Sequence, residues 1–571
     1  MLKFKNLLLL CFFLAILCGL WVRFYRFGSI PVGLYWDEVA IAADAKAVAL
    51  TGFDLHQQSW WQPIYLSYGD YKLPAYIWFS SVVALFTSNP VTIVRLPALF
   101  VGLGTIIMAG LLSVRLFAQK KENKFSTFVF GAFIMAVSCW ATHFSRVGFE
   151  AYLGQLLISI AVWLSLSSKK VNWILAQLVA GAAVYSYFSV RFVWPFLFLA
   201  LVIYQACQQS LLLSGQKSQS KQKISLLKTK DSLIKICTLI IFLIVLLPLI
   251  KSGYYQSMLI FRYSAESVLN STDWPALSRE LQSIEGGGLL GRVIYHRYWL
   301  LFRQLLANFS KHLSLDFLFL SGDANLRHGT GLTGLFLLPT LLPLMSGIYH
   351  LIKEKWLTFI LLLCWWLISI VPAAVPMEVP HALRSLNALM PIVLIMSFGL
   401  LRLFEFSQKP TSGVWNVSRK TSLLFIWIIL VLFGYGRFAF HYFSVYPSLS
   451  QASWQGGYAE LAQVACESYK ESHPLILSAN DQRFFLWILA NCEISANDYQ
   501  EAHFQQAHLK TIGSLMFVPL NEVDPFSTSS QTWWLRPTID PLKENLTLSE
   551  TTSLMVGDEQ YSLYNLTEKL P

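Results

Sequence analysis

The sequence is poor in charged residues. Only 13% of its 571 residues are Asp, Glu, Lys or Arg, whereas a soluble domain carries about 25%. Hydrophobic residues make up 55% of the chain, and the mean hydropathy is +0.51. This shortage of charge excludes a series of soluble domains and predicts a polytopic membrane protein.

Other signatures are also missing from the chain. It has no Cys-x-x-Cys and no His/Cys grouping, which argues against a zinc motif. It has no Gly-Lys-Ser/Thr of a nucleotide-binding P-loop and no internal repeat of the kind found in many transporters. Of the eight cysteines, six lie in or beside apolar runs and form no disulfide framework. The other two, Cys466 and Cys492, could pair in an oxidising compartment or stay reduced.

Long apolar runs recur between Leu7 and His441. Each is long enough, or nearly so, to cross a hydrocarbon core of about 30 Å as a helix. The first run follows Lys3 and Lys5 as in a signal peptide, but no small-residue cleavage site precedes Trp21, so we interpret it as a retained anchor. We predict about eleven transmembrane helices, near residues 7–22, 93–115, 125–143, 150–167, 173–190, 192–207, 234–250, 332–352, 356–373, 385–404 and 422–441.

One apolar stretch decides the topology. Residues 73–86 are uncharged but too short for a span, so we interpret them as an interfacial helix. Five loops then face the cytoplasm: 116–124, 168–172, 208–233, 353–355 and 405–421. These loops hold fifteen Lys and Arg against four carboxylates, as the positive-inside rule requires. The N-terminus is therefore predicted to be cytoplasmic.

The same topology divides the chain into a membrane domain, residues 1–441, and an external tail, residues 442–571. The membrane domain has two large external loops, 23–92 and 251–331, while the Ser/Gln/Lys-rich segment 208–233 is predicted to be a flexible cytoplasmic linker. The tail alternates helix-like and strand-like stretches, so we predict a small α/β or α+β extracytoplasmic domain. It carries six cations against fifteen carboxylates. The net charge of +11 thus reflects the cytoplasmic loops and gives no reason to expect a nucleic-acid partner.

Ionisable side chains near the hydrocarbon are costly, so those at the outer ends of the spans are the candidate functional residues. Asp37 and Glu38 begin a helical run in the first loop. A carboxylate there can cap the helix or accept a proton from an attacking group. Asp70 and Lys72 lead into the interfacial helix. A lysine at this place can reach the headgroups or bind a lipid-linked phosphate.

Further ionisable groups lie in three other external segments. Arg146 and Glu150, in the short turn 143–153, have the spacing of an ordinary i,i+4 pair, but they lie on the same side of the membrane as Asp37. The remaining groups lie in the glycine-rich segment 317–334 and in segment 375–391: Asp323, Arg327, His328, Glu378, His381 and Arg384. All of them converge on the external face, although the topology was inferred from other residues.

Together these features resemble the GT-C glycosyltransferases, in particular the family 39 group of protein O-mannosyltransferases and lipid A aminoarabinose transferases. The resemblance covers about residues 1–441, and its fold is an all-α membrane domain. Leu73 and Glu150 stand where the family has a proline and often an aspartate. The motifs that carry the resemblance are Asp37-Glu38, Lys72-x-Pro74, Arg95-Leu96-Pro97 and Ser145-Arg146 with Glu150 after it.

The resemblance implies a polyprenyl-phosphate-dependent hexosyl or pentosyl transferase of the cell membrane. It would move a sugar, with inversion, to a protein, lipid or glycan acceptor outside the cell, without a nucleotide. Asp37 is implied as the catalytic base, with Glu38 second. The residues implied to bind the donor phosphate are Lys72, Arg146, Arg327 and Arg384, and those implied to bind substrate are Asp70, Glu150, Asp323, His328 and His381.

No metal ligands and no cofactor are assigned, although two adjacent carboxylates are compatible with a divalent cation. Two other functions are compatible with the sequence. One is a transporter or flippase of a lipid-linked sugar, since charged residues in spans can line a path. The other is a non-catalytic scaffold whose tail binds a partner.

Overall fold

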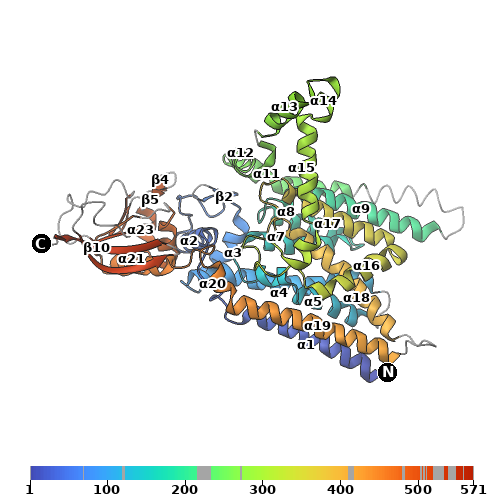
Figure 1. Ribbon diagram of the computed structural model, residues 1–571. Coiled ribbons are helices and arrows are strands. Elements are labelled where there is room, and N and C mark those ends of the chain that lie inside the picture. Colours follow the sequence, from blue (N-terminus) through green and yellow to red (C-terminus); the bar gives the residue numbers. More distant parts are fainter. Residues whose placement is uncertain are drawn as a thin grey trace. The chain divides into compact units, whose positions relative to one another are not determined.

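The structure is a computed structural model of the protein (Figure 1). It describes residues 2–67, 70–118, 123–214, 233, 235–270, 273–408, 417–478, 483–501, 504–505, 508–509, 511–518, 533–537, 548–556 and 559–569. Most of the predicted linker 208–233, the middle of the predicted loop 405–421 and parts of the tail lie outside these residues.

The chain divides into two compact units. The first unit comprises residues 1–25, 100–145 and 150–440, and the second comprises residues 26–99, 146–149 and 441–571. The predicted membrane domain and tail meet near residue 441, where the first unit also ends. The first external loop, however, belongs to the same unit as the tail.

The first unit is built almost entirely of helices, as the apolar runs predict. A backbone in hydrocarbon must satisfy its hydrogen bonds internally, and a helix does so. Its helices in chain order are α1 (Leu2–Phe24), most of α4 (Pro90–Phe117), α5 (Lys124–Ala136), α6 (Cys139–Phe144), α7 (Glu150–Ser165), α8 (Lys170–Val184), α9 (Val190–Ser214), α11 (Leu239–Ile250), α12 (Tyr255–Glu266), α13 (Asp273–Glu285), α14 (Leu289–Ile294), α15 (Arg297–Lys311), α16 (Leu341–Glu354), α17 (Trp356–Ala374), α18 (Leu389–Gln408) and most of α19 (Val417–Ser444).

Six helices of the described part of the chain are long and apolar enough to cross a membrane: α1, α4, α9, α17, α18 with the short turn before it, and α19. Residues 235–250 and 255–264 form a seventh candidate that is bent by 88°. The polytopic character is therefore confirmed, and each of the eleven predicted stretches contains a helix. The number eleven stays a prediction, because α5, α7 and α8 are shorter apolar helices.

Two predicted spans differ from the structure for a local reason. The predicted span 125–143 is broken between α5 and α6, where Ser138 caps α6 by accepting a hydrogen bond from the Ala141 N–H at 3.3 Å. The predicted span 332–352 becomes helical only near Leu338, because the preceding residues form a loop that contains four glycines. A serine cap and a glycine-rich loop both override an apolar run.

Helix α18 lies at the centre of the first unit, with 89% of its apolar window buried against 39% for α1. It packs closely on α16 through glycines: a Cβ on Gly399 would meet the Pro343 carbonyl oxygen at 1.9 Å, and one on Gly347 would meet the Ile395 carbonyl oxygen at 2.0 Å. Small residues that let two backbones approach are typical of helix pairs in membranes.

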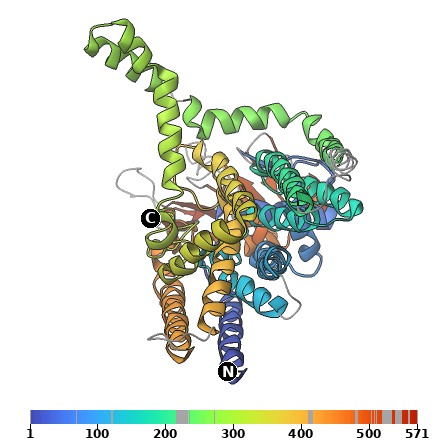
Figure 2. The ribbon, with the colours of Figure 1, turned by 90° about the vertical axis from the view of Figure 1, so that its right-hand side faces the viewer.

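Helices α13, α14 and α15 form an arm that stands out from the other helices of the first unit in both views (Figures 1 and 2). After α15 the chain makes a π-helical turn, η4 (Asp316–Leu320), and then the glycine-rich loop that precedes α16. This return places residues 321–334 beside the segment between α17 and α18.

The second unit combines the first external loop with the tail. The loop contributes α2 (Trp36–Thr51), the antiparallel pair β1 (Tyr65–Ser67) and β2 (Asp70–Lys72), and α3 (Pro74–Ala84), which is the helix predicted to be interfacial. The tail elements are α20 (Tyr446–Ser450), α21 (Tyr458–Lys470), β3 (Leu475–Leu477), α22 (Phe485–Asn491), α23 (Ala496–Glu501), β4 (Phe504–Gln505), β5 (His508–Leu509), β6 (Thr511–Ile512), β7 (Leu515–Phe517), β8 (Trp533–Pro537), β9 (Leu548–Val556) and β10 (Glu559–Lys569).

The tail strands form a mixed sheet in the order β6-β7-β3-β8-β10-β9. Strand β3 is parallel to both β7 and β8, while the other neighbouring pairs are antiparallel. Strand β3 is buried along its whole length, as a central strand of a covered sheet should be.

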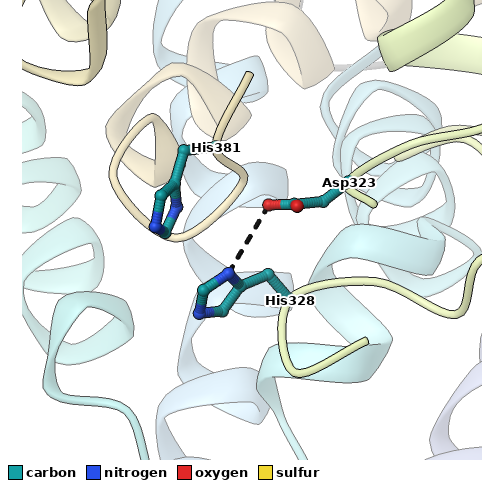
Figure 3. A group of neighbouring side chains, drawn as sticks. All are labelled: Asp323, His328 and His381. Carbon is teal, nitrogen blue, oxygen red and sulfur yellow. Dashed lines mark ion pairs between the residues drawn. The ribbon is translucent and has the colours of Figure 1, made fainter. Parts of the chain in front are cut away.

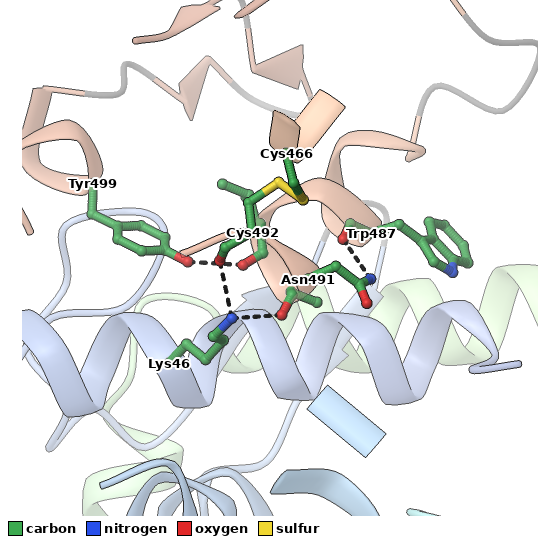
Figure 4. The surroundings of a disulfide bond; sticks show 8 residues. Lys46, Cys466, Trp487, Asn491, Cys492 and Tyr499 are labelled. Atoms are coloured by element: carbon green, nitrogen blue, oxygen red, sulfur yellow. Dashed lines mark hydrogen bonds between the residues drawn. A yellow bond between two sulfur atoms is a disulfide. The ribbon is translucent and has the colours of Figure 1, made fainter. Parts of the chain in front are cut away.

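A disulfide joins Cys466 of α21 to Cys492, which directly follows α22 (Figure 4). The pairing that the sequence leaves open is therefore present. Beside it, the Lys46 ammonium of α2 donates hydrogen bonds to the carbonyl oxygens of Ala490 at 2.7 Å and of Cys492 at 3.0 Å. A cation at these carbonyls stabilises the C-terminal end of α22, so the first loop and the tail are held together by both charge and packing.

Candidate functional site

The structure distributes the predicted site residues between the two units. The second unit holds Asp37, Glu38, Asp70, Lys72 and Arg146, and the first unit holds Glu150, Asp323, Arg327, His328, His381 and Arg384. Each group is described within its own unit.

Asp37 and Lys72 form an ion pair at the entrance of two helices. Asp37 is in the first turn of α2, where the helix dipole favours a carboxylate. Lys72 ends β2 and is followed by Leu73 and Pro74, which start α3. The Lys72 ammonium bonds the Asp37 carboxylate and lies 3.9 Å from Asp70. The Lys72 side chain is 6% exposed and that of Asp37 is 21% exposed, so this pair is reachable from one side.

Glu38, the neighbour of Asp37, is fully buried in a different set of contacts. It accepts hydrogen bonds from Arg95 Nε at 3.0 Å and from Arg95 Nη2 at 2.9 Å. It also accepts from the Gly148 N–H at 2.7 Å and the Tyr35 N–H at 3.4 Å. Its carboxylate therefore closes a network, whereas Asp37 keeps an accessible side.

Arg95 has a clear role that the sequence reasoning missed, although its motif was part of the resemblance. Its guanidinium donates to the carbonyl oxygens of Pro31 at 2.8 Å and Gly28 at 3.3 Å, and it lies over the Trp454 ring at 5.6 Å. The Glu38–Arg95 pair thus holds the segment before α2 in place. Gly148 is required beside it, since a Cβ there would meet the Val94 side chain at 2.3 Å.

Arg146 is also buried, at 1% exposure. Its Nη2 donates to the carbonyl oxygens of Arg26 at 3.0 Å and Ile30 at 3.2 Å. Its guanidinium lies over the rings of Tyr442 at 5.5 Å and Phe443 at 5.1 Å. These contacts tie the turn at Arg146 to its unit, and the predicted role of Arg146 as a phosphate ligand stays a prediction.

In the first unit, Asp323, His328 and His381 lie together and are all buried (Figure 3). Asp323 Oδ2 is 3.6 Å from His328 Nδ1, and the two imidazole rings stack with their centroids 4.4 Å apart. One ligand atom from each residue lies within 4.8 Å of the others. The residues come from two loops, 321–334 and the segment between α17 and α18, which the return of the chain after η4 brings together.

Neighbouring groups orient these side chains. Asp323 accepts hydrogen bonds from the Ala382 N–H at 2.7 Å and the Asn325 N–H at 2.9 Å. The His381 N–H donates to His312 Nε2 at 3.1 Å. Burial lowers the pKa of His312, and burial together with the charges of His328 and Arg384 lowers the pKa of His381 well below its usual value. Both imidazoles are therefore neutral near pH 7.

Two predicted arginines lie close to this group in the chain. Arg327 donates from Nε and from its backbone N–H to the Asn325 side-chain oxygen, each at 3.1 Å. Arg384 lines a cavity of about 240 Å³ together with Arg262 of α12. Glu150, by contrast, begins α7, where its backbone oxygen accepts a hydrogen bond from Ser186 at 2.7 Å.

The cavity lined by Arg262 and Arg384 has no carboxylate among the described residues around it; its other lining residues are Tyr187, Phe188, Ser189, Phe192, Ser267, Pro372, Val375 and Pro376. The Arg262 guanidinium lies 4.9 Å and that of Arg191 4.6 Å from the centroid of the Phe188 ring. Such a wall of aromatic rings and guanidinium groups suits an anion with an apolar tail. The sequence reasoning missed Arg262, although its place in the second external loop was a signal.

The fold is similar to that of ArnT from Cupriavidus metallidurans. The apo structure of ArnT has a TM-score of 0.53 and 10% identity, and the match covers 97% of this chain and 97% of that chain. ArnT bound to undecaprenyl phosphate gives a TM-score of 0.51 with the same identity and coverage. The oligosaccharyltransferase of Archaeoglobus fulgidus gives a TM-score of 0.49 at 12% identity and covers 85% of this chain and 63% of that chain. No protein-family model and no curated protein matches the sequence.

The chain is thus a multi-pass membrane protein with the GT-C fold. The resemblance to the GT-C glycosyltransferases that the sequence motifs indicate is confirmed at the level of the fold.

Proposed function

We propose that the protein is a membrane glycosyltransferase that moves a sugar from a polyprenyl-phosphate donor to an acceptor on the extracytoplasmic face. The observation that carries this proposal is the Asp37–Lys72 pair, a partly exposed carboxylate bonded to a lysine directly before an apolar helix. The GT-C fold supports it, and ArnT, a protein of that fold, has been seen bound to undecaprenyl phosphate.

In the proposed reaction, a hydroxyl or amine of the acceptor attacks the anomeric carbon of the sugar. Asp37 accepts the acceptor's proton, the new bond forms on the opposite face of the sugar, and the bond from the anomeric carbon to the phosphate oxygen breaks. The products are the glycosylated acceptor and polyprenyl phosphate. The phosphate gains negative charge as it leaves, and Lys72 stabilises that charge.

The ion pair couples the two roles. In the resting structure the Lys72 ammonium is held by Asp37. A donor phosphate that takes over Lys72 leaves the Asp37 carboxylate without its cation, and the carboxylate is then able to accept a proton. Binding of the donor would in this way activate the base.

We assign the arginine-lined cavity of the first unit to the anionic, lipid-linked part of the substrate. Its two guanidinium groups, from Arg262 and Arg384, offer charged hydrogen bonds, and its aromatic and proline walls offer apolar contact. Arg146 and Arg327 are proposed as further phosphate ligands, and the residues proposed to contact sugar or acceptor are Asp70, Glu150, Asp323, His328 and His381.

The orientation follows from the charge pattern of the loops. Fifteen Lys and Arg in the five loops assigned to the cytoplasm place the first external loop and the tail outside the plasma membrane. The acceptor is therefore proposed to be a protein, lipid or glycan of the cell envelope.

The test of the function supplies the purified protein in lipid nanodiscs with radiolabelled hexosyl and pentosyl polyprenyl phosphates and an extract of envelope acceptors. We expect label to pass from one of these donors to an acceptor, and none to pass from the matching nucleotide sugar. Proteoliposomes loaded with the same lipids test the alternative function. Movement of the lipid across the bilayer without transfer of the sugar would support a flippase and contradict the proposal.

Replacement of Arg262 or Arg384 by Ala is expected to raise the KM for the donor roughly 10- to 100-fold, because a hydrogen bond to a charged group contributes about 1.5–3 kcal/mol. The value of kcat should change little. Arg292→Ala, which removes an exposed arginine of α14, is the matched control. An unchanged KM in both cavity variants would show that the donor does not bind there.

A further inference from the structure

We propose that Asp323, His328 and His381 form a binding site for a divalent transition metal, with zinc as the ion that the donor set favours. Two imidazole nitrogens and one carboxylate are typical ligands of zinc, whereas magnesium and calcium take oxygen ligands. Among the residues that the structure describes, this is the one group of three or more His, Cys, Asp or Glu side chains close enough to share an ion. The proposal is independent of the glycosyltransferase function.

The distances fit a metal site that needs only a small adjustment. Ligand atoms that are each about 2.1 Å from one zinc ion lie about 3.4 Å apart in a tetrahedron. Asp323 Oδ2 and His328 Nδ1 are already 3.6 Å apart. The ligand atom of His381 lies within 4.8 Å of both, so a turn of its side chain by a few tenths of an ångström up to about 1 Å would complete the set.

The three side chains are held in place before any ion binds. Both carboxylate oxygens of Asp323 accept a backbone N–H, from Ala382 and from Asn325. The Arg384 N–H points to His381 Nδ1 at 3.4 Å, which directs the Nε2 atom of that ring to the ion. Such outer contacts orient metal ligands and are typical of built metal sites. The site is also buried, so the ion would be shielded from water.

The position of the site suggests what the ion does. Asp323 and His328 belong to the loop before α16, while His381 belongs to the segment before α18, and two helices separate these segments in the chain. An ion bound by all three would fasten the end of the second external loop to the entrance of the central helix. Three protein ligands leave a fourth position open for water or an anionic ligand. An anion there would offset the charges of Arg327 and Arg384, which both act on His381.

Zinc binding by the full-length protein tests the proposal. The protein is purified in detergent without a metal-affinity step, stripped with a chelator, and equilibrated with zinc, and the bound metal is measured by mass spectrometry. We expect about one zinc ion per chain, and a tetrahedral d–d absorption when cobalt replaces zinc. The substitutions Asp323→Asn and His328→Gln should each weaken zinc binding by roughly 10- to 100-fold or more and abolish the cobalt spectrum.

The matched control is His350→Gln. His350 of α16 lies 2.9 Å from the Glu354 carboxylate, so it is a histidine–carboxylate pair outside the proposed site, and its loss should leave zinc binding unchanged. Thermal unfolding of each chelated variant verifies that it is folded, and His381→Gln replaces any variant that is not. Absence of zinc from the wild-type protein, or equal zinc affinity in the wild type and the folded variants, would overturn the proposal. Neither result concerns the transfer of sugar, which is measured separately.

Discussion

Replacement of Asp37 by Asn is expected to lower kcat for sugar transfer about 10²- to 10⁴-fold, the usual contribution of a general base. The amide keeps the shape of the carboxylate but cannot accept the proton of the attacking group. The donor KM should stay the same or fall, because Lys72 loses its partner Asp37 and is freed for the phosphate. Initial rates with a radiolabelled donor, taken over a range of donor concentrations, separate kcat from KM.

Two other variants make this result specific. Glu280→Gln removes an exposed carboxylate of α13 and should leave transfer unchanged. Lys72→Met should instead raise the donor KM, because it removes the cation proposed for the phosphate. If Asp37→Asn transfers sugar at the wild-type rate, the base lies elsewhere.

Replacement of Glu38 by Gln is expected to destabilise the second unit by about 3–5 kcal/mol, the cost of breaking a buried ion pair. The Arg95 guanidinium would stay buried without its carboxylate, and the Gly148 N–H would lose a charged acceptor. Thermal unfolding in detergent, followed by tryptophan fluorescence, measures the loss. The double variant Glu38→Gln with Arg95→Met should recover part of it, because no unpaired charge is then buried.

The adjacent carboxylate provides the control for this experiment. The Asp37–Lys72 pair is partly exposed, so Asp37→Asn should cost no more than about 1 kcal/mol. The two neighbouring substitutions thus have opposite signatures: the first removes activity and keeps stability, and the second removes stability. A Glu38→Gln protein as stable as the wild type would show that the pair with Arg95 does not anchor the first loop.

The local sequence was sufficient for the helices but not for their ends. Apolar runs become helices because a backbone in hydrocarbon has to satisfy its own hydrogen bonds, and every predicted span contains one. The break at Ser138 was visible in the sequence as a serine cap, but hydropathy alone does not weigh one hydroxyl against an apolar run. The short helix α3 was predicted well because its length and its proline at the first turn agree.

The candidate site could be predicted as a set of residue types but not as a division of roles. Asp37 and Glu38 are adjacent and chemically alike. Their roles differ because Arg95, 57 residues after Glu38, and Gly148, 110 residues after it, both bind Glu38. The disulfide is a similar case, since the sequence offers Cys466 and Cys492 but only packing brings them together.

By itself, the sequence determined that this is a membrane protein, which side its lysines mark, and which ionisable residues lie outside, because these properties depend on composition and short-range order. The tertiary structure alone decided which carboxylate is buried and which is open, that Arg262 joins Arg384 at one cavity, and that Asp323 and His328 meet His381. Those outcomes depend on contacts between segments far apart in the chain, and the burial and charge of each side chain follow from such contacts.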